Sequence, residues 1–271
     1  MTLSTIADYA TEIRRQIIAM LAEAGSGHPG GSLSIADILA QLYFGSMNID
    51  PAKPLWPERD RLVLCKGHAA PALYAALALR GYFSVEELPN LRKLGSRLQG
   101  HPDMRKLPGV DMSTGSLGQG LSAACGMALA GRLDGYPYYT YAILGDGETE
   151  EGQVWEAAML AAHYKLDHLI AFLDHNRLQI DGKTTEVLSP EPLDEKWRAF
   201  GWRVLSINGH DVAAIAQAIE AAKQSSEQPV MIIAETVKGK GVSFMENQAG
   251  WHGNAPNAEQ AAQALAELSE R

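Results

Sequence analysis

The sequence predicts an α/β fold in which a parallel sheet carries helices on both faces. Two observations lead to this prediction. Short apolar runs without polar alternation recur along the chain, and helical patterns separate them; the runs occupy residues 62–65, 141–144, 169–173, 203–207 and 230–234. Strands that are apolar on both sides are typical of parallel sheets buried between helices.

The first helix is predicted from apolar residues at helical spacing. Ile6, Ala10, Ile13 and Ile17 recur at intervals of three or four residues, and the pattern ends at Gly25. An apolar stripe of this period marks the face that a helix buries, and a glycine commonly follows the last turn. We therefore expect an amphipathic helix over this segment.

A second helix is expected after a glycine-rich segment. Ser34 with Asp37 resembles a capping box, in which each side chain satisfies a backbone N–H of the first turn. Ile35 and Ile38 then begin its apolar face. The remaining helical patterns cover residues 69–80, 117–132, 153–164 and 212–223, the last one capped by Asp211.

The composition is that of a globular protein that buries a large core. The chain has 271 residues, of which 46% are apolar and 20% charged, and its formal net charge is −9. This balance argues against nucleic-acid and anionic-membrane partners, because phosphate recognition over a surface needs a basic field. An anionic ligand must then be bound by local groups.

The two cysteines favour neither a disulfide framework nor a zinc site. Cys65 and Cys125 lie in unrelated segments without C-x-x-C spacing, so a cytoplasmic location is expected. Asp8 and Glu12 interrupt the apolar residues of the N-terminal segment, a pattern that does not fit a signal peptide or a membrane span. We expect residues 1–271 to form one domain with a short helical C-terminal tail.

Residues able to bind a ligand follow four of the predicted strands. They are Lys66-Gly67-His68, Gly145-Asp146-Gly147, Asp174-His175-Asn176 and the loop TVKGKG at 236–241. Ligands of such folds bind beyond the carboxyl ends of the parallel strands. These four segments are therefore expected to line one edge of the sheet.

Asp146 and Asn176, thirty positions apart, are predicted to hold one metal ion. Carboxylate and amide oxygens are the hard ligands that Mg²⁺ or Ca²⁺ prefers, and two places of the shell then suit the oxygens of a diphosphate. Gly145 and Gly147 permit a tight turn and a close backbone approach to an anion. Each motif alone also fits a surface turn, but the pair after two successive strands favours the metal site.

Four of the eight histidines stand beside a glycine in a motif, namely His28, His68, His101 and His252. Glycine lets the backbone approach a ligand, while an imidazole donates to phosphate or sugar oxygens or transfers a proton near neutral pH. Zinc binding is the rival interpretation, but these histidines lack a cluster at ligand spacing. Any one of them alone also fits a packing or turn role.

The other histidines carry less signal. His163 and His168 flank a helix–strand turn and His210 precedes a helix cap, so these three are expected to be structural or solvated. The role of His175 stays open.

Three further segments carry residues with candidate roles. The stretch STGSLGQG at 113–120 fits either close packing against a cofactor or another chain, or plain helix entry, and its glycine order is not that of a dinucleotide fingerprint. Glu148 and Glu150 are expected to favour the dipole of the following helix. Lys238 and Lys240 fit either a phosphate-covering loop or a solvated one.

Taken together, these stretches resemble the transketolases, in the part of that family that binds the phosphates of thiamine diphosphate. The family's motifs occur in order as SGHPGGSLS, KGHAAPALY, QGHPD, STGSLGQGLS, GDGETEEGQVWEA, DHNRLQIDG and TVKGKGVSFMEN with a later WHG. The resemblance covers about residue 8 to residue 253 and implies a thiamine diphosphate-binding fold of the PP type. The histidine motifs favour transketolase over the 2-oxo acid dehydrogenases.

The resemblance implies a role for each motif residue. Metal binding is implied for Asp146, Asn176 and the carbonyl of Leu178, with Mg²⁺ as the expected ion and Ca²⁺ or Mn²⁺ as substitutes. Cofactor binding is implied for His68, Gly115, Leu117, Gly147, Glu151 and Asn176, with Glu151 at the subunit boundary. Proton transfer and donor-sugar binding are implied for His28, His101 and His252.

The resemblance is incomplete, because a full transketolase continues into a pyrimidine-binding domain and a C-terminal domain. The residues after His252 are too few for another domain. We therefore expect the N-terminal subunit of a split transketolase, completed by a separate C-terminal subunit, with two copies of each chain. The expected reaction transfers a two-carbon ketol unit from a ketose or its phosphate to an aldose or its phosphate.

Two alternatives remain open. A deoxyxylulose-phosphate-synthase-like or 2-oxo acid dehydrogenase component would share the GDG motif and the asparagine, although the histidines of GHPG and GHPD count against it. A non-catalytic thiamine diphosphate-binding module would need no proton-handling groups, and the retained histidines favour a catalytic role. Neither the donor sugar nor the acceptor sugar follows from the sequence.

Overall fold

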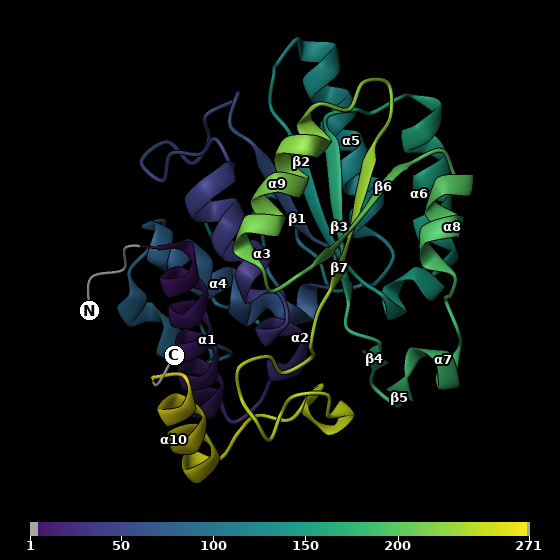
Figure 1. The fold of residues 1–271 in the computed structure, drawn as a ribbon. Helices are drawn as coiled ribbons and strands as arrows, with labels where there is room; N and C mark the ends of the chain where they lie inside the picture. Colours follow the sequence, from purple (N-terminus) through teal and green to yellow (C-terminus); the bar gives the residue numbers. More distant parts are fainter. Residues whose placement is uncertain (1–4, 270–271) are drawn as a thin grey trace.

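The computed structural model describes residues 5–269, and its centre is a five-stranded sheet (Figure 1). The strands are β1 (Arg61–Leu64), β2 (Thr140–Gly145), β3 (Leu169–His175), β6 (Arg203–Asn208) and β7 (Val230–Glu235). Their order is β1-β2-β3-β7-β6, and every neighbouring pair is parallel. The predicted strands and their parallel pairing are confirmed.

Ten α-helices surround the sheet within the described residues. They are α1 (Ile6–Ala24), α2 (Pro29–Leu33), α3 (Ala36–Gln41), α4 (Ala70–Arg80), α5 (Gly120–Asp134), α6 (Gly152–His163), α7 (Thr184–Val187), α8 (Leu193–Ala199), α9 (Val212–Lys223) and α10 (Ala258–Glu267). Short turns of other helical types are η1 (Leu42–Ser46), η2 (Gly67–Ala69), η3 (Val85–Asn90), η4 (Gly147–Glu150) and η5 (Ala249–Trp251). A small antiparallel hairpin pairs β4 (Leu178–Gln179) with β5 (Gly182–Lys183).

Helices cover both faces of the sheet, because alternate strand residues point to opposite sides. Ile143 and Phe172 belong to one buried cluster together with residues of α1, α3, α4 and α9. Leu144 and Leu173 belong to a second cluster with residues of α5, α6 and α8. The predicted α/β architecture, with helices on both faces, is confirmed.

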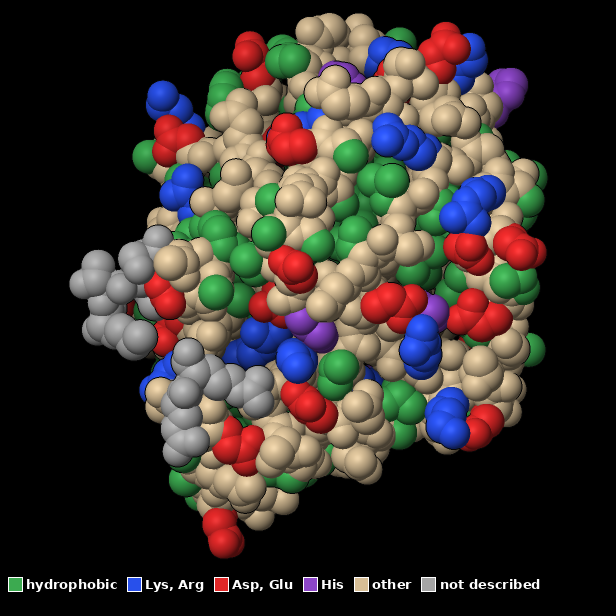
Figure 2. Space-filling view, in the orientation of Figure 1, with side chains coloured by type: hydrophobic (Ala, Val, Ile, Leu, Met, Phe, Trp, Pro, Cys, Tyr) green, Lys and Arg blue, Asp and Glu red, His purple; other side chains and the backbone are tan. Residues whose placement is uncertain are grey.

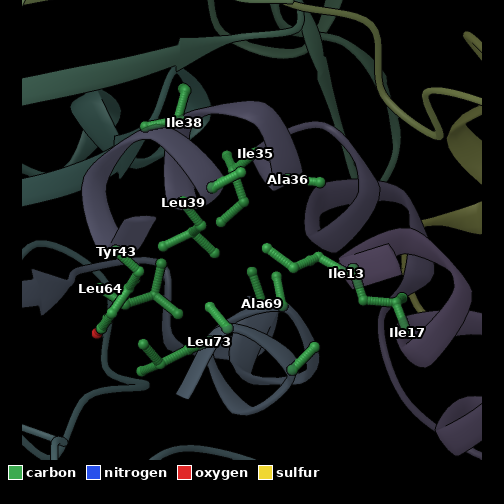
Figure 3. Packing of buried hydrophobic residues seen from close by; sticks show 14 of the residues in the cluster. Ile13, Ile17, Ile35, Ala36, Ile38, Leu39, Tyr43, Leu64, Ala69 and Leu73 are labelled. Carbon is green, nitrogen blue, oxygen red and sulfur yellow. The ribbon is translucent and has the colours of Figure 1, made fainter. Parts of the chain in front are cut away.

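The first of these clusters joins three helices that the sequence places far apart. Ile13 of α1, Leu39 of α3 and Leu73 of α4 point toward one another in Figure 3, and all three are fully or almost fully buried. Burying one large aliphatic side chain stabilises a fold by about 1.5–3 kcal/mol. This packing fixes the segment between α1 and α3, which carries His28, against the sheet.

Two predicted helix starts differ from the structure. Ser34 and Asp37 form no capping box, since α3 begins at Ala36 with Ile35 at the N-cap and no side-chain cap. The Ser34 hydroxyl instead donates to Asp174, because a buried partner in the sheet competes with the local cap. Helix α5 begins at Gly120 rather than at residue 117, since Gly118 adopts a left-handed φ of 83°. Real capping boxes close the starts of α1 and α10.

The segments predicted to carry the ligand gather at one end of the sheet. In Figure 1 this is the lower end, where α2, the β4–β5 hairpin and the loop after β7 lie. On the face shown in Figure 2, acidic and basic side chains are interspersed. Within residues 5–269, no helix combines the length and the apolar character that a membrane crossing requires.

Candidate active site and cofactor site

A cavity of about 210 Å³ opens where the carboxyl ends of β1, β2 and β3 meet the loop after β7. Nine of the eleven predicted site residues line it: His28, His68, Gly115, Leu117, Asp146, Gly147, Asn176, Leu178 and His252. The register of the sheet brings them together, because Gly145 pairs with Asp174 and so sets Asp146 beside the segment that carries Asn176. The expected convergence on one sheet edge is therefore observed.

Asp146, Asn176 and Leu178 line this cavity and carry oxygens of three kinds, a carboxylate, a side-chain amide and a backbone carbonyl. The Asp146 carboxylate is buried and accepts hydrogen bonds from the amides of Gly147, at 2.8 Å, and Arg177. Among residues 5–269, no lysine or arginine pairs with this carboxylate. Burial, and then the charge of Asp174, raises the pKa of Asp146 to about 6.

A divalent cation fits this set of groups. Carboxylate, amide and carbonyl oxygens are the ligands that hard cations prefer. A buried carboxylate whose charge is disfavoured gains most from a cation beside it. In the part of the chain described, no group of three or more His, Cys, Asp and Glu residues is arranged to hold a metal.

Two buried lysines, Lys66 and Lys238, line the same cavity. Lys66 Nζ donates to Asp174 Oδ2 at 2.5 Å and to the Gly31 carbonyl at 2.7 Å. Lys238 Nζ donates to the Leu178 carbonyl and lies against His252 Nδ1, both at 2.9 Å. Burial, and then the charge of Lys66, lowers the pKa of Lys238 to about 8. Lys66 is paired with Asp174, whereas Lys238 forms no ion pair among the described residues and is suited to an anion such as a diphosphate.

Three imidazoles form a cluster that adjoins Lys238 in the cavity. Ring centroids of His28, His68 and His252 lie 5.1–5.4 Å apart. Burial, followed by the charge of Arg92, lowers the pKa of His28 to about 4, and burial with Lys238 lowers that of His252 to about 3. Burial with Lys66 lowers the pKa of His68 as well. All three rings are therefore neutral at neutral pH.

One ring atom in this cluster lacks a partner. His28 Nδ1 is buried without a hydrogen bond to any of the described residues. A buried polar atom left unpaired costs about 1–3 kcal/mol. A ligand in the cavity can supply the missing partner.

His101 and Glu151 are exposed and do not line the cavity. Each packs behind a glycine of the 113–120 loop. A Cβ atom on Gly115 would lie 2.8 Å from His101 Cδ2, and one on Gly118 would lie 2.8 Å from Glu151 Cβ. These glycines therefore allow the loop to pass between the two side chains and the cavity.

The fold and this site can be compared with known proteins. Residues 6–269 match the family model described as "Transketolase, thiamine diphosphate binding domain". The chain belongs to the transketolase family. The predicted family is confirmed, and the chain comprises the domain of that family that binds thiamine diphosphate.

Two transketolase relatives of similar length carry subunit names. The 6-deoxy-6-sulfo-D-fructose transketolase subunit SqwG of Clostridium sp. (strain MSTE9) is 55% identical over 259 residues, which are 96% of this chain and 94% of that protein. An apulose-4-phosphate transketolase subunit of Phocaeicola vulgatus is 43% identical over 271 residues, which are 100% of this chain and 96% of that protein.

Longer transketolases match over part of their length. The human transketolase is 43% identical over 267 residues, which are 98% of this chain but 42% of that protein. The solved transketolase of Leishmania mexicana matches with a TM-score of 0.93 and 34% identity, covering 99% of this chain and 42% of that chain. The chain thus spans about two-fifths of these longer transketolases, whose fold it shares.

The structure shows a role of Glu148 that the sequence did not predict. Glu148 was expected only to favour the dipole of the following helix, but it is buried and lines the cavity. Its carboxylate accepts from the amides of Gly118 at 3.0 Å and Gly145 at 3.2 Å. Glu148 therefore ties the 113–120 loop to the GDG turn. The run of acidic residues did not indicate this role of Glu148, since sequence position does not reveal burial.

The sequence placed Lys66 and Asp174 at this edge of the sheet, but it did not predict that they pair with each other. Asp174 is fully buried and accepts from Lys66, Ser34, Asn176 and Thr236. Burial opposes its charge, but Lys66 and the hydroxyl donors hold the pKa of Asp174 below its ordinary value. The sequence did contain a sign of this pair, because an aspartate and a lysine each stand at the end of an apolar strand. Two such charges, when buried, are expected to pair with each other.

The remaining histidines behave largely as expected. His210 lies between Asp37, at 2.7 Å, and the amide of Val237, at 2.8 Å, and so has a structural role. His168 Nδ1 contacts the Tyr138 carbonyl at 3.1 Å. His175, whose role was open, lies between Glu191 and Glu235; burial opposes protonation, but the two carboxylates raise its pKa.

Of the two loop lysines, one faces the cavity. Lys238 is buried and lines it, whereas Lys240 forms an ion pair with Glu246 at 3.5 Å. Lys238 therefore lies where the phosphate-covering interpretation requires it, and Lys240 fits the surface interpretation.

Proposed function

We propose that this chain is the N-terminal subunit of a split transketolase that transfers a two-carbon ketol unit from a ketose to an aldose. The observation that carries the proposal is the joint cavity of oxygen ligands, lysines and neutral histidines in a transketolase-family domain. Residues 1–271 would form one thiamine diphosphate-binding domain with a helical tail, and a separate C-terminal subunit would supply the other domains. Relatives named as subunits match along 94–96% of their length, which supports this division.

In this proposal Mg²⁺ binds to the Asp146 carboxylate, the Asn176 amide oxygen and the Leu178 carbonyl, and Ca²⁺ or Mn²⁺ can substitute. Asn176 Nδ2 donates to Asp174 at 2.9 Å, which directs the nitrogen to the sheet and leaves the oxygen for the cation. The Leu178 carbonyl accepts from Lys238 in the structure. Binding of the metal would therefore require Lys238 to donate to another acceptor, for which a diphosphate oxygen is suited.

Residues around the lysines would hold the cofactor. His68 and Gly147 would meet the diphosphate, while Gly115 and Leu117 would pack against the rest of the molecule. Asn176 would serve the cofactor through the metal, and Glu151, which lies outside the cavity, would act at the boundary with the partner chain. When bound, thiamine diphosphate supplies the electron sink for breaking the ketose carbon–carbon bond.

The histidines would handle the protons and hydroxyl groups of the substrate. His28 and His252 would take and return protons at the reacting hydroxyls, for which neutral rings are required. Their lowered pKa values favour that state, and a bound diphosphate would move these values back toward neutrality. His101 would bind the donor near its carbonyl end.

The substrate of this proposal is a ketose that carries an anionic group. Relatives are named for 6-deoxy-6-sulfo-D-fructose and for apulose 4-phosphate, so both sulfonated and phosphorylated donors belong in the test. Two copies of each chain would assemble in the cytoplasm and share two sites. Neither nucleic acid nor a membrane takes part.

A panel of donors tests this function. This chain is co-purified with its C-terminal subunit, supplied with thiamine diphosphate and Mg²⁺, and offered each donor with a common aldose acceptor. Two-carbon transfer from at least one anionic ketose is expected. Release of carbon dioxide from a 2-oxo acid would favour the dehydrogenase alternative, and cofactor binding without any turnover would favour a non-catalytic module.

A further inference from the structure

Arg92 lies between the two turns that carry His28 and His101. A Cβ atom on Gly100 would lie 3.0 Å from Arg92 Cζ, and one on Gly27 would lie 3.7 Å from Arg92 Nε. Each of these glycines directly precedes one of the two histidines. The planar guanidinium therefore packs against both glycine–histidine peptides.

The backbone of Arg92 is held in an uncommon conformation that maintains this placement. Its φ is 61°, in the left-handed region that non-glycine residues seldom adopt. The Arg92 amide donates to the Leu98 carbonyl at 2.8 Å, which closes the loop back toward Gly100. Strain of this kind persists where the surrounding structure demands it.

The charge of Arg92 is not neutralised by the chain. Among residues 5–269, its guanidinium makes no hydrogen bond and no ion pair. After burial, the charge of Arg92 is the largest influence that lowers the pKa of His28, and it also lowers that of His101. Four other charged or titratable groups lie near His28, namely His68, His101, Lys238 and His252. The charge of Arg92 also acts on Tyr74.

We propose that Arg92 is a positioning residue for ketol transfer: its guanidinium braces the two glycine–histidine turns, and its unpaired charge disfavours a second positive charge on either imidazole. The inference rests on the proposed function, because it gives His28 and His101 a reason to stay unprotonated. A lysine in this place keeps the charge but has no planar group to lie on both peptides. The two roles of Arg92 can therefore be separated.

The test compares Arg92→Met and Arg92→Lys with the control Lys93→Met. The control removes the charge of the next residue, which pairs with exposed Glu23. NMR titration of the imidazoles in the full chain measures the effect of the Arg92 charge on His28 and His101, and it does not require activity. The variants His28→Gln and His101→Gln assign the two signals. In Arg92→Met both titrations should move upward by roughly half a unit, the size expected for one partly screened charge. They should stay in place in Arg92→Lys and in Lys93→Met.

The complex with the C-terminal subunit gives the second readout. In Arg92→Met, the acid limb of the kcat/KM profile should move to higher pH, while calorimetry finds thiamine diphosphate affinity unchanged. In Arg92→Lys the acid limb should stay at the same pH. The plateau of kcat/KM should be lower, because the lysine cannot pack against both glycine–histidine peptides. Unchanged imidazole titrations in Arg92→Met would overturn the inference. Absence of transfer in the unaltered complex would instead overturn the proposed function, since the titrations do not depend on it.

Discussion

Asn176 donates through Nδ2 to Oδ2 of Asp174 at 2.9 Å, while its Oδ1 accepts from the Leu178 amide at 3.1 Å. Asp174 lies in β3, which ends at His175, and Asn176 is the next residue after the strand. Asp174 itself is neutralised by Lys66 at 2.5 Å. One buried ion pair thus fixes the orientation of the amide that we propose as a metal ligand.

The first prediction concerns this ion pair. Asp174→Asn should lower the free energy of unfolding by about 3–5 kcal/mol, because it leaves the buried Lys66 ammonium without its partner. The double variant Asp174→Asn with Lys66→Met should recover part of that loss. Urea unfolding of these two variants and of Lys66→Met alone measures both effects. A double variant less stable than the sum of the single losses would mean that the ion pair does not control stability here.

The second prediction concerns the proposed metal ligand Asp146. Asp146→Ala should abolish cofactor-dependent transfer by the complex while the chain stays folded, because its buried carboxylate is desolvated and carries no cationic partner among the described residues. Without metal, the thermal midpoint of Asp146→Ala should equal or exceed that of the unaltered chain. Mg²⁺ and thiamine diphosphate should raise the thermal midpoint of the unaltered chain but not that of Asp146→Ala. Asp181→Ala, an exposed aspartate in the nearby hairpin, is the control. Near-normal transfer in Asp146→Ala would remove it from the metal site.

The third prediction concerns the loop that Glu148 ties to the GDG turn. Glu148→Gln should weaken thiamine diphosphate binding and lower the free energy of unfolding by about 2 kcal/mol, since one of two charge-assisted hydrogen bonds is lost. Glu150→Gln is the matched control, because Glu150 contacts Gln179 at 2.8 Å and lies outside the cavity. Calorimetry measures the thiamine diphosphate affinity of both variants, and thermal unfolding measures their stability. Equal effects of the two changes would contradict the assigned role.

The fourth prediction is a pH dependence that arises from a residue outside the cavity. Asp37 binds Arg14 and His210; burial opposes its charge, but these partners hold the pKa of Asp37 below its ordinary value. A depressed pKa contributes stability above the unfolded value of 3.8, and that contribution is lost as the pH falls through the folded value.

Asp37→Asn should therefore cost about 3 kcal/mol near pH 7, and the difference from the unaltered chain should shrink as the pH is lowered through the acid range. Urea unfolding at several pH values measures it. Asp50→Asn removes an exposed pair with Lys53 and should change little at any pH. A difference for Asp37→Asn that is independent of pH would refute the electrostatic explanation.

The fifth prediction separates substrate chemistry from cofactor binding. His28→Ala should lower turnover of the complex by about 100-fold, with thiamine diphosphate affinity largely kept, because the lysines and the metal ligands are untouched. His163→Ala, an exposed histidine on α6, is the control. A loss of cofactor affinity in His28→Ala, found by calorimetry, would reassign His28 to the cofactor anchor.

Local patterns were enough to predict the strands and the edge of the sheet at which the site forms. Apolar runs define buried strands, and the ends of parallel strands share one edge, so Asp146 and Asn176 were expected to meet. The order of the sheet was not predictable in this way. β7 enters between β3 and β6, and no local pattern encodes that choice.

Partners that lie far apart in the sequence explain the errors. Ser34 looked like a helix cap because its neighbours fit one, but it bonds to Asp174, 140 positions away. Glu148 was interpreted as a first-turn acid that favours a helix dipole, whereas it is buried and accepts from the amide of Gly118, 30 positions away. In both cases a tertiary hydrogen bond outweighed a local preference worth about 1 kcal/mol.

The central claim is that the active site is divided between two chains. Its most direct test is ketol transfer from xylulose 5-phosphate to ribose 5-phosphate, or from the donor found in the panel, with thiamine diphosphate and Mg²⁺. The assay is run with only this chain, with only the C-terminal subunit, and with both. We predict transfer only in the mixture; transfer by this chain in isolation would contradict the divided site.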